Sequence, residues 1–407
     1  MKTLTMLGAI LRGLSYDDGK CSCVARLADP ATVDAFSAAD LLRVKDLSLS
    51  ADGLDAAGRK QLTSQLRTAW QTHVAANRVR PAAVVVTVAG QDVAFGIGRT
   101  VDQARHPAPG SADTARRETT VTAPRGIFAD RSSVVSGRVS VVTGGAQGFG
   151  EGIVRSLAEG GSTVCIADLN VAGAQRLADE LNSEHGRTVA LAFGGNVTDE
   201  ASVEQMIDAI VESVGSVDLL VSNAGVLKAG SVVDMSLADF NFVTSVNYVG
   251  FFICTKFFAP IMALQNAASE GKMTSDIVQI NSKSGLEGSN RNGAYAGSKF
   301  GSIGLVQSFA MELVADNIKV NAICPGNFFE GPLWSDPERG LFVQYLRTGK
   351  VPGAKTVEDV KRFYEGKVPM NRGCRPDDVV RAICYIVEQV YETGQAVPVT
   401  GGQVMLN

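Results

Sequence analysis

The sequence predicts an α/β protein with a doubly wound parallel sheet, preceded by a small additional N-terminal α/β domain. From Gly137 onward, short apolar runs alternate with stretches in which apolar residues recur at helical spacing. A glycine-rich turn follows the first of these runs. The chain has 407 residues, of which 45% are hydrophobic and 20% charged, as is ordinary for a globular protein with a sizeable core.

Seven strands are expected in the larger part of the chain. The candidates are "VSVVTG" at 139–144, "STVCIAD" at 162–168, "TVALAFGGNV" at 188–197, "VDLLVSNAG" at 217–225, "DIVQINS" at 276–282, "KVNAICPG" at 319–326 and "QAVPVTGG" at 395–402. Helical patterns fill the gaps, so we expect βαβ units, a parallel sheet and helices on both faces. Ligands of such folds bind at the carboxyl ends of the strands.

The first 104 residues read as a separate small α/β domain of unknown role. Helices are expected at 38–45 and 56–75, strands at 82–88 and 92–97, and a further helix from residue 100. Residues 105–130 are rich in Pro, Ser, Thr, Ala and Gly without apolar periodicity, which is typical of a linker or an extended arm. The larger domain then covers 131–407, and we expect a chain starting near Ala129 to fold and stay active.

Charge and composition favour small-molecule partners. The formal net charge is -4, from 38 basic and 42 acidic residues, which gives no reason to expect nucleic acid or an anionic membrane as a partner. The seven cysteines are an odd number and several lie in apolar runs, which favours reduced cytoplasmic thiols over disulfides. The three histidines are scattered, so we expect no metal site.

Neither apolar segment of the chain is a good membrane or secretion signal. The first fifteen residues lack a convincing cleavage site, so they do not resemble a signal peptide. The stretch 248–264 is interrupted by Thr255 and Lys256 and is shorter than the ~20 residues that a membrane span needs. It is expected to be a buried helix or one packed against a partner subunit.

The turn "TGGAQGFG" predicts a Rossmann-type dinucleotide site. Gly144, Gly148 and Gly150 allow a tight turn and close approach of the backbone to a pyrophosphate, which would lie at the amino end of a helix starting near Phe149. Asp168 follows the next strand, where a carboxylate can accept hydrogen bonds from the ribose hydroxyls and repel a 2′-phosphate. NAD is therefore favoured over NADP, and a helix cap is the alternative role of Asp168.

A second group of residues predicts acid/base chemistry. Tyr295 and Lys299 in "YAGSK" are four positions apart on a helix and so share one face. A lysine cation beside a phenol favours the phenolate and should lower the pKa of Tyr295. Ser282 ends a strand thirteen positions earlier, where its hydroxyl can bind the reacting oxygen. Taken singly, these residues could be a solvated helix face and a strand-end cap.

From about residue 137 to 407 the chain resembles the short-chain dehydrogenase/reductase family. The motifs that carry the resemblance are "TGGAQGFG", "SNAG", "SVNYVG", "NSKSG", "YAGSK" and "CPGN". It implies that Tyr295 is the acid/base, that Lys299 also holds the nicotinamide ribose, that Ser282 orients the substrate oxygen, and that Asn247 supports a water in a proton relay. Asn196 replaces the aspartate that this family commonly has near the adenine ring.

The same resemblance implies a set of cofactor-binding residues. They are Gly144, Gln147, Gly148, Phe149, Gly150, Asp168, Asn196, Val197, Asn223, Ala224, Gly225, Tyr295, Lys299, Pro325 and Gly326. The helix after Asn247 is similar to the family's subunit-packing helix, which implies a homotetramer, with a dimer as second choice.

Several phrases resemble the sorbitol-6-phosphate 2-dehydrogenases within this family. They are "IVQINSKSGLEGSN", "KVPMNRGC" and "TGQAVPVTGGQVM", and they imply NAD-dependent interconversion of D-sorbitol 6-phosphate and D-fructose 6-phosphate. The long insertion 327–374 is expected to be a lid over a polar substrate. The alternatives are a dehydrogenase of an unphosphorylated polyol or small hydroxyaldehyde, and a non-catalytic nucleotide-sensing protein.

A phosphorylated substrate needs cations that take no part in hydride transfer. The first candidates are Lys283, next to Ser282, and Arg291, four positions before Tyr295. Lys228 and Arg372 are weaker candidates. Each could also be a surface charge near a cleft.

The segment 80–105, "RPAAVVVTVAGQDVAFGIGRTVDQAR", resembles the end of the class II aldolase domain that is fused to some sugar dehydrogenases. The metal-binding histidines of an aldolase are missing from this part, so we interpret it as non-catalytic, with a role in assembly or regulation.

Overall fold

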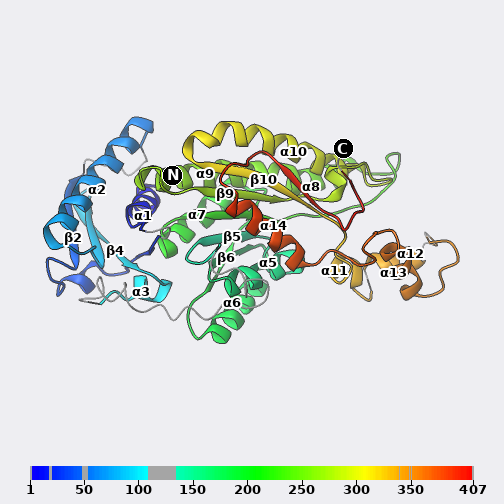
Figure 1. Cartoon of the computed structure of the whole chain (residues 1–407), viewed down its shortest axis with the longest axis horizontal. Coiled ribbons are helices and arrows are strands. Elements are labelled where there is room, and N and C mark those ends of the chain that lie inside the picture. The colour runs from blue at the N-terminus through cyan, green and yellow to red at the C-terminus, as the bar shows by residue number, and fades with distance from the viewer. Residues whose placement is uncertain are drawn as a thin grey trace.

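The computed structural model describes residues 2–17, 21–47, 54–108, 134–338, 340–347, 349 and 351–405. It confirms the α/β class and the seven expected strands, which form one parallel sheet in the order β11-β10-β9-β8-β5-β6-β7 (Figure 1). The strands are β5 (Val139–Thr143), β6 (Thr163–Asp168), β7 (Ala190–Gly194), β8 (Leu219–Ser222), β9 (Ser275–Ile280), β10 (Ile318–Pro325) and β11 (Ala396–Val399). Chain order reverses between β5 and β8, so ligands are expected beyond these strand ends.

Helices cover both faces of this sheet. On one face lie α5 (Gly148–Glu159), α6 (Val171–His185) and α14 (Pro376–Glu388), which share a core with the strands. On the other face lie α7 (Glu200–Val214), α9 (Gly250–Ala268) and α10 (Gly293–Leu313). Strand residues such as those of β9 and β10 are buried along their whole length, because each side of the sheet is covered.

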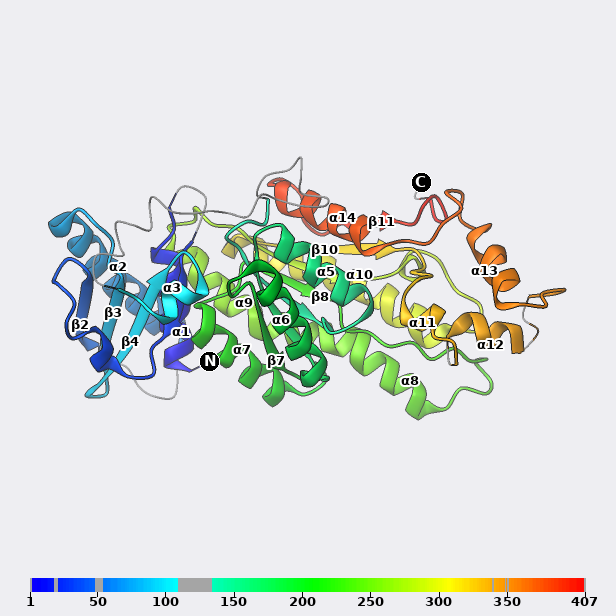
Figure 2. The same cartoon turned by 90° about the horizontal axis from the view of Figure 1, so that it is seen from below.

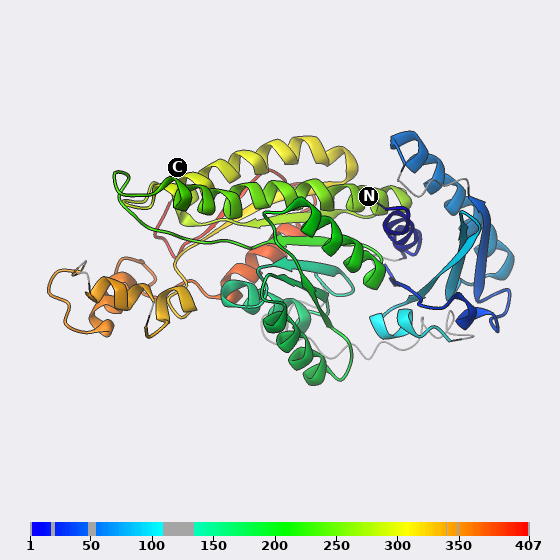
Figure 3. The ribbon, with the colours of Figure 1, turned by 180° about the vertical axis from the view of Figure 1, so that it is seen from behind.

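The long apolar helical run includes α8 (Leu237–Thr244) and α9. The span Leu237–Ala268 is long and apolar enough to cross a membrane, but 56% of its most apolar window is buried inside the molecule. A core helix of a soluble protein passes the same length and hydropathy test, and Figure 3 shows α9 running beside α10 over the sheet.

A second, smaller sheet forms at one end of the molecule. It has the order β1-β4-β3-β2, with β2 and β3 parallel and the other pairs antiparallel. Its elements are β1 (Cys23–Arg26), β2 (Leu41–Leu47), β3 (Ala83–Val88) and β4 (Gln91–Gly98), with helices α2 (Ala56–Asn77) and α3 (Val101–Arg105). Figure 2 shows this sheet at the end of the molecule opposite the helices of the 327–374 insertion.

The expected helix at 38–45 is wrong, because residues 41–47 form strand β2. Leu42 and Val44 are buried while Arg43 and Lys45 are exposed, so the segment alternates with the period of two that a half-buried strand requires. Pairing with β3 outweighs the helix preference of Leu, Arg and Lys. The other expected elements of this part are present as α2, β3, β4 and α3.

One helix that the sequence did not suggest joins the two parts of the chain. This helix, α1 (Thr3–Leu14), packs on α9 and α7 at the amino end of the large sheet, and its apolar residues belong to the same core cluster. The backbones approach so closely that a Cβ on Gly13 would lie 2.2 Å from the Gln265 carbonyl oxygen. Residues before the predicted boundary thus complete the larger core, which argues against a freely separable larger domain.

A buried ion pair fixes α1 in place. Arg12, which is fully buried, pairs with Asp218 just before β8. The Asp218 carboxylate also accepts hydrogen bonds from the Val139 N–H (2.7 Å) and from Gln265 Nε2 (2.9 Å). Residues 109–133, which contain most of the expected linker, lie outside the described residues, and the division into domains stays a prediction.

Candidate active site

The glycine-rich turn has the geometry expected for a pyrophosphate cradle. Gly144 and Gly148 both have a φ of +62°, and a Cβ on Gly150 would lie 2.0 Å from the Gly144 carbonyl oxygen. Only glycine fits such a close passage at the start of α5. Gln147 is the residue before the helix and is exposed, so the amino end of α5 is open toward the solvent side of the turn. These residues fit a bound dinucleotide.

Asp168 lies at the carboxyl end of β6, next to the glycine-rich turn. Its carboxylate accepts hydrogen bonds from the N–H groups of Ala146 (2.9 Å) and Asn170 (2.8 Å). The cap of the following helix α6 is Asn170, whose side chain accepts the Gly173 N–H (3.0 Å). Asp168 is therefore tied to the turn, and another residue caps the helix.

Asn223 connects the ends of β5 and β8 at the point where chain order reverses. Its side-chain amide donates to the carbonyl oxygens of Thr143 and Gly144, each at 3.0 Å. The Thr143 hydroxyl accepts the N–H groups of Asn223 (3.0 Å) and Ala224 (3.1 Å). The "SNAG" motif thus supports the glycine-rich turn from the neighbouring strand.

The remaining expected cofactor residues lie at the ends of other strands. After β7, Asn196 Oδ1 accepts hydrogen bonds from the N–H (3.1 Å) and the hydroxyl (2.8 Å) of Thr198, so this oxygen already has partners. The next residue, Val197, packs against Gly250. Pro325 ends β10, and the Gly326 N–H donates to the Val399 carbonyl oxygen at 2.9 Å.

Phe149 at the start of α5 stacks on Phe328 beyond β10, with ring centroids 4.7 Å apart. Phe328 directly follows the "CPGN" motif, and this position is the only sequence signal for its place near the site.

The structure brings Ser282, Tyr295 and Lys299 together. Ser282 follows β9, and its hydroxyl is hydrogen-bonded to Tyr295. Tyr295 and Lys299 lie on the first turns of α10, with the Lys299 ammonium 5.7 Å from the Tyr295 ring centroid. Lys299 Nζ donates to the Ile280 carbonyl oxygen at 2.8 Å. A phenol, a hydroxyl and an ammonium converging in this way can bind and protonate a reacting oxygen.

The expected lowering of the Tyr295 pKa does not occur in this structure. Burial raises the pKa of Tyr295, and the hydrogen bond with Ser282 only partly opposes this effect. Burial also lowers the pKa of Lys299 to about 8. The Lys299 ammonium is directed to the Ile280 carbonyl oxygen and is not among the groups that shift the pKa of Tyr295, so desolvation is the largest effect on the phenol.

Asn247 lies in a short π-helical turn, Ser245–Val249, between α8 and α9. Its side chain accepts the Val226 N–H (2.8 Å) and donates to the Val226 carbonyl oxygen (2.9 Å) and to Ser298 Oγ (3.2 Å). A Cβ on Gly225 would lie 3.4 Å from Asn247 Oδ1 and 3.7 Å from Lys299 Nζ. Single π-helical turns often occur at functional sites, and this one places Asn247 beside the lysine.

Two further residues of the site, Asn281 and Cys324, are not predicted from the sequence. Asn281 accepts the Ser282 N–H (2.8 Å) and donates to the Lys299 carbonyl oxygen (3.0 Å), so it fixes the serine to α10. Cys324 lies on β10 beside the Ser282 backbone, and burial raises the pKa of its thiol to about 12. Asn281 is the first residue of "NSKSG" and Cys324 the first of "CPGN", so their places in these motifs are the sequence signals that could have indicated them.

The insertion 327–374, called the lid here after its expected role, forms a small helical unit with a core of its own. It contains α11 (Pro332–Ser335), α12 (Leu341–Arg347) and α13 (Val357–Glu365), and its buried residues include Phe329, Trp334 and Val360. Its last segment crosses the ends of β10 and β11, where the Met370 N–H donates to the Gly401 carbonyl oxygen (3.2 Å) and the Cys374 N–H to that of Asn327 (2.8 Å).

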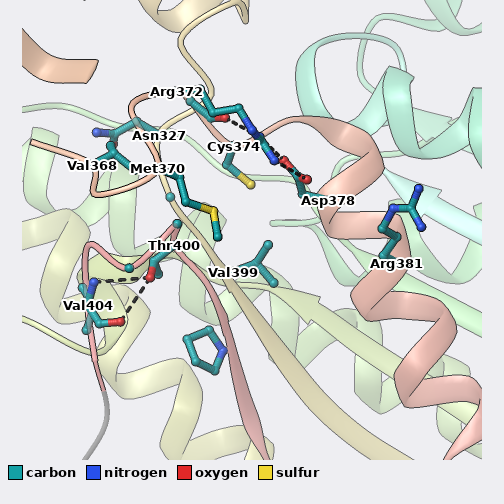
Figure 4. A pocket seen from close by; sticks show the side chains of 15 residues that line it. Asn327, Val368, Met370, Arg372, Cys374, Asp378, Arg381, Val399, Thr400 and Val404 are labelled. Carbon is teal, nitrogen blue, oxygen red and sulfur yellow. Dashed lines mark hydrogen bonds and ion pairs between the residues drawn. The ribbon is translucent and has the colours of Figure 1, made fainter. Parts of the chain in front are cut away.

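Two hollows flank this lid. A pocket of about 390 Å³ lies between its last segment, the ends of β10 and β11, and α14 (Figure 4). A second, of about 380 Å³, lies between the loop after β8 and lid residues Leu333, Leu341 and Gln344. The described residues contain no cluster of three or more His, Cys, Asp or Glu side chains suited to a metal ion, and all seven cysteines are free thiols.

The four cations considered for a phosphate have different surroundings. Lys228 pairs with Asp239, and Arg372 makes two hydrogen bonds to Asp378, at 2.6 and 2.9 Å (Figure 4). Arg291 is exposed. Lys283 is half-buried beside Ser282, and no ion pair to it occurs among the described residues.

Comparisons with known proteins agree with this geometry. The profile of the family described as "short chain dehydrogenase" matches residues 138–333. Sorbitol-6-phosphate 2-dehydrogenase of Escherichia coli (strain K12) is 37% identical over 271 residues, which are 66% of this chain and 99% of that protein. The chain belongs to the short-chain dehydrogenase/reductase family. It is thus an oxidoreductase of a family that uses nicotinamide cofactors.

Solved short-chain dehydrogenase/reductase structures show the same fold. Sorbitol-6-phosphate 2-dehydrogenase from Erwinia amylovora is 39% identical, with a TM-score of 0.60, and covers 66% of this chain and 100% of its own. The 3-ketoacyl-(acyl-carrier-protein) reductase from Brucella melitensis, complexed with NADH, is 27% identical, with a TM-score of 0.56, and covers 66% and 99%. The family resemblance therefore extends over about two thirds of the chain.

Proposed function

We propose that this enzyme interconverts D-sorbitol 6-phosphate and D-fructose 6-phosphate with NAD as the hydride acceptor. The observation that carries the proposal is the 37% identity to a sorbitol-6-phosphate 2-dehydrogenase over 99% of that protein's length. The 3-oxoacyl-[acyl-carrier-protein] reductase of Thermotoga maritima, a relative named for another substrate, is 30% identical. A half-buried cation, Lys283, beside the catalytic serine supports a phosphorylated substrate.

The proton chemistry follows from the three converging side chains. Bound NAD supplies a hydride acceptor. In oxidation, Tyr295 accepts the proton of the substrate hydroxyl, and in reduction it returns a proton to the forming alkoxide. Ser282 holds the reacting oxygen by a hydrogen bond and holds the phenol in place through the hydrogen bond that the two residues share. Lys299 provides the positive charge nearby and holds the ribose, and Asn247 orders a water behind it.

Asp168 supports NAD in place of NADP. Its carboxylate is held beside the glycine-rich turn by two backbone N–H groups, at the place where the ribose attached to adenine would lie. A 2′-phosphate would meet this negative charge at close range.

We also propose a cytoplasmic homotetramer, with a dimer as second choice. Helices α8, α9 and α10 expose large apolar side chains, as a subunit interface would require. They are Leu237, Phe240, Phe242, Phe252, Phe300 and Met311. Light scattering on the purified enzyme measures this state directly, and a monomer at micromolar concentration would contradict it.

The substrate proposal is tested by NADH absorbance with a panel of sorbitol 6-phosphate, free sorbitol, other polyols and small hydroxyaldehydes. We expect sorbitol 6-phosphate to have the highest kcat/KM. A preference for free sorbitol would contradict the phosphate, and turnover of none of them would favour a nucleotide-sensing protein.

The same assay on the Tyr295→Phe variant tests the role of Tyr295 as the acid/base. It removes the transferable proton, so we expect at least about a 10²-fold loss of kcat with NAD binding retained. A variant that keeps more than about a tenth of the wild-type kcat would refute the role of Tyr295.

A further inference from the structure

We propose that Lys283 and Lys367 together bind the phosphate of the substrate, one from the body of the enzyme and one from its lid. This inference rests on the proposed function and adds to it a residue, Lys367, that the sequence did not suggest. It also assigns the lid a chemical task, because the second cation reaches the substrate only when the lid segment lies over the site.

Lys283 comes from the floor of the site. It directly follows Ser282 in the short turn Lys283–Gly285 at the carboxyl end of β9. The turn is packed against α10, which carries Tyr295. The side chain is half-buried, and burial is the largest cause of a lowered pKa of Lys283. A partly desolvated ammonium without a carboxylate is a site prepared for an anion.

Lys367 comes from the lid. It lies two residues beyond α13 and just before Val368, which packs against Gly401 at the end of β11. Only β10 lies between β9 and β11, so the two lysines lie near strand ends that are two strand positions apart at the same edge of the sheet. Lys367 Nζ lies over the rings of Phe363 (4.3 Å from the centroid) and Tyr364 (5.2 Å), which hold the cation without neutralising it.

The two charges act on one another. Lys367 is one of the groups that lower the pKa of Lys283, while Glu287 acts in the opposite direction without forming an ion pair to it. No ion pair to either lysine is found in the described part of the chain, whereas Lys228 and Arg372 are paired with Asp239 and Asp378. A dianionic phosphate between the two ammonium groups would relieve their repulsion.

The test compares the ratio of kcat/KM for sorbitol 6-phosphate to that for free sorbitol in wild type, Lys283→Ala and Lys367→Ala. We expect each variant to lower this ratio about tenfold or more, mainly through the KM of the phosphorylated substrate. Lys367→Arg should keep most of the ratio because it keeps the cation. Lys361→Ala is the matched control, since Lys361 lies on α13, the lid helix that precedes Lys367, and pairs with Glu365 at 3.8 Å.

A second measurement does not depend on the polyol. Inorganic phosphate should inhibit wild type in competition with sorbitol 6-phosphate, and its inhibition constant should rise about tenfold in Lys283→Ala and in Lys367→Ala but not in Lys361→Ala. If wild type prefers sorbitol 6-phosphate and Lys367→Ala leaves both readouts unchanged, the two-lysine site is refuted while the proposed function stands. If wild type has no preference for the phosphorylated substrate, the proposed function itself fails.

Discussion

At the scale of single residues, the site contains a buried cation, Lys299, that destabilises the folded state. Lys299 is 4% exposed, and its pKa is lowered to about 8 because burial disfavours the charged form. Between pH 8 and the ordinary lysine value of 10.5, the unfolded chain binds a proton that the folded protein does not, so stability rises with pH over this window. Below pH 8 the folded protein carries the full cost of the buried charge, on the order of 3 kcal/mol.

We therefore expect Lys299→Met to be inactive and more stable than wild type at pH 7.5. The variant's advantage over wild type in the free energy of unfolding should fall by about 2 kcal/mol between pH 7.5 and pH 9.5, because the wild-type lysine loses its proton in this range. Denaturant unfolding at both pH values measures this difference. A variant that is less stable at pH 7.5, or a difference that does not change with pH, would show that the lysine is not a buried cation in the folded protein.

Asp168 gives a prediction on cofactor choice. Asp168→Ala should weaken NAD binding by about tenfold, the loss of roughly one charged hydrogen bond, and relieve the rejection of NADP. Dissociation constants from fluorescence titration measure both effects. Asn170→Ala is the matched control, because it removes the cap of α6 and should lower stability by about 1 kcal/mol without changing cofactor preference. An unchanged preference in Asp168→Ala would assign the residue to the turn alone.

At the scale of elements, strand and turn chemistry were predictable and long-range packing was not. All seven strands of the large sheet follow from apolar runs alternating with helical patterns, and the glycine-rich turn from its spacing. The helix expected at 38–45 is a strand, because its partner β3 lies about forty residues away and the local preference of the residues points to a helix. The position of α1 depends on contacts with α9, which no local pattern encodes.

The same division holds for the site. Ser282, Tyr295 and Lys299 were found because their spacing is itself the signal. Lys367 was missed because it joins the site through the lid, far from the catalytic motifs in sequence. The expected effect of Lys299 on the pKa of Tyr295 was wrong because the direction of the ammonium toward Ile280 depends on side-chain geometry.

The buried pair between α1 and β8 gives a prediction on stability. Arg12→Ala leaves the Asp218 carboxylate buried without its cation and should lower the free energy of unfolding by about 3–5 kcal/mol. Arg26→Ala is the control, because Arg26 pairs with Glu212 at 3.2 Å on the surface and such pairs contribute about 1 kcal/mol or less. Chemical denaturation of both variants would refute the structural role of α1 if the two losses were equal.

At the scale of the whole molecule, the smaller part completes the larger one. The sequence suggests that a chain starting near Ala129 would fold and stay active. The structure leads us to expect the reverse, since removal of α1 exposes the apolar face of α9 and leaves Asp218 unpaired.

The shortened chain should be mostly insoluble or lose cooperative unfolding, while a chain that keeps residues 2–17 joined to the larger part by a flexible linker should recover both. Measuring the soluble yield and the calorimetric unfolding of both shortened chains shows whether the larger part folds without α1. A stable, active shortened chain would restore the interpretation of two separable domains.

The place of α1 also affects how the chain is made. Arg12 leaves the ribosome 206 residues before Asp218, the residue that neutralises it. At about 5–20 residues per second, the helix waits roughly 10 to 40 seconds for its partner strand and longer for α9. During that time α1 can pack only against α2 and β1 of the smaller part, and its face toward α7 and α9 stays exposed, so newly made protein is open to self-association and to chaperones. Slower translation should therefore lower the yield of soluble enzyme, and chaperone supply should raise it.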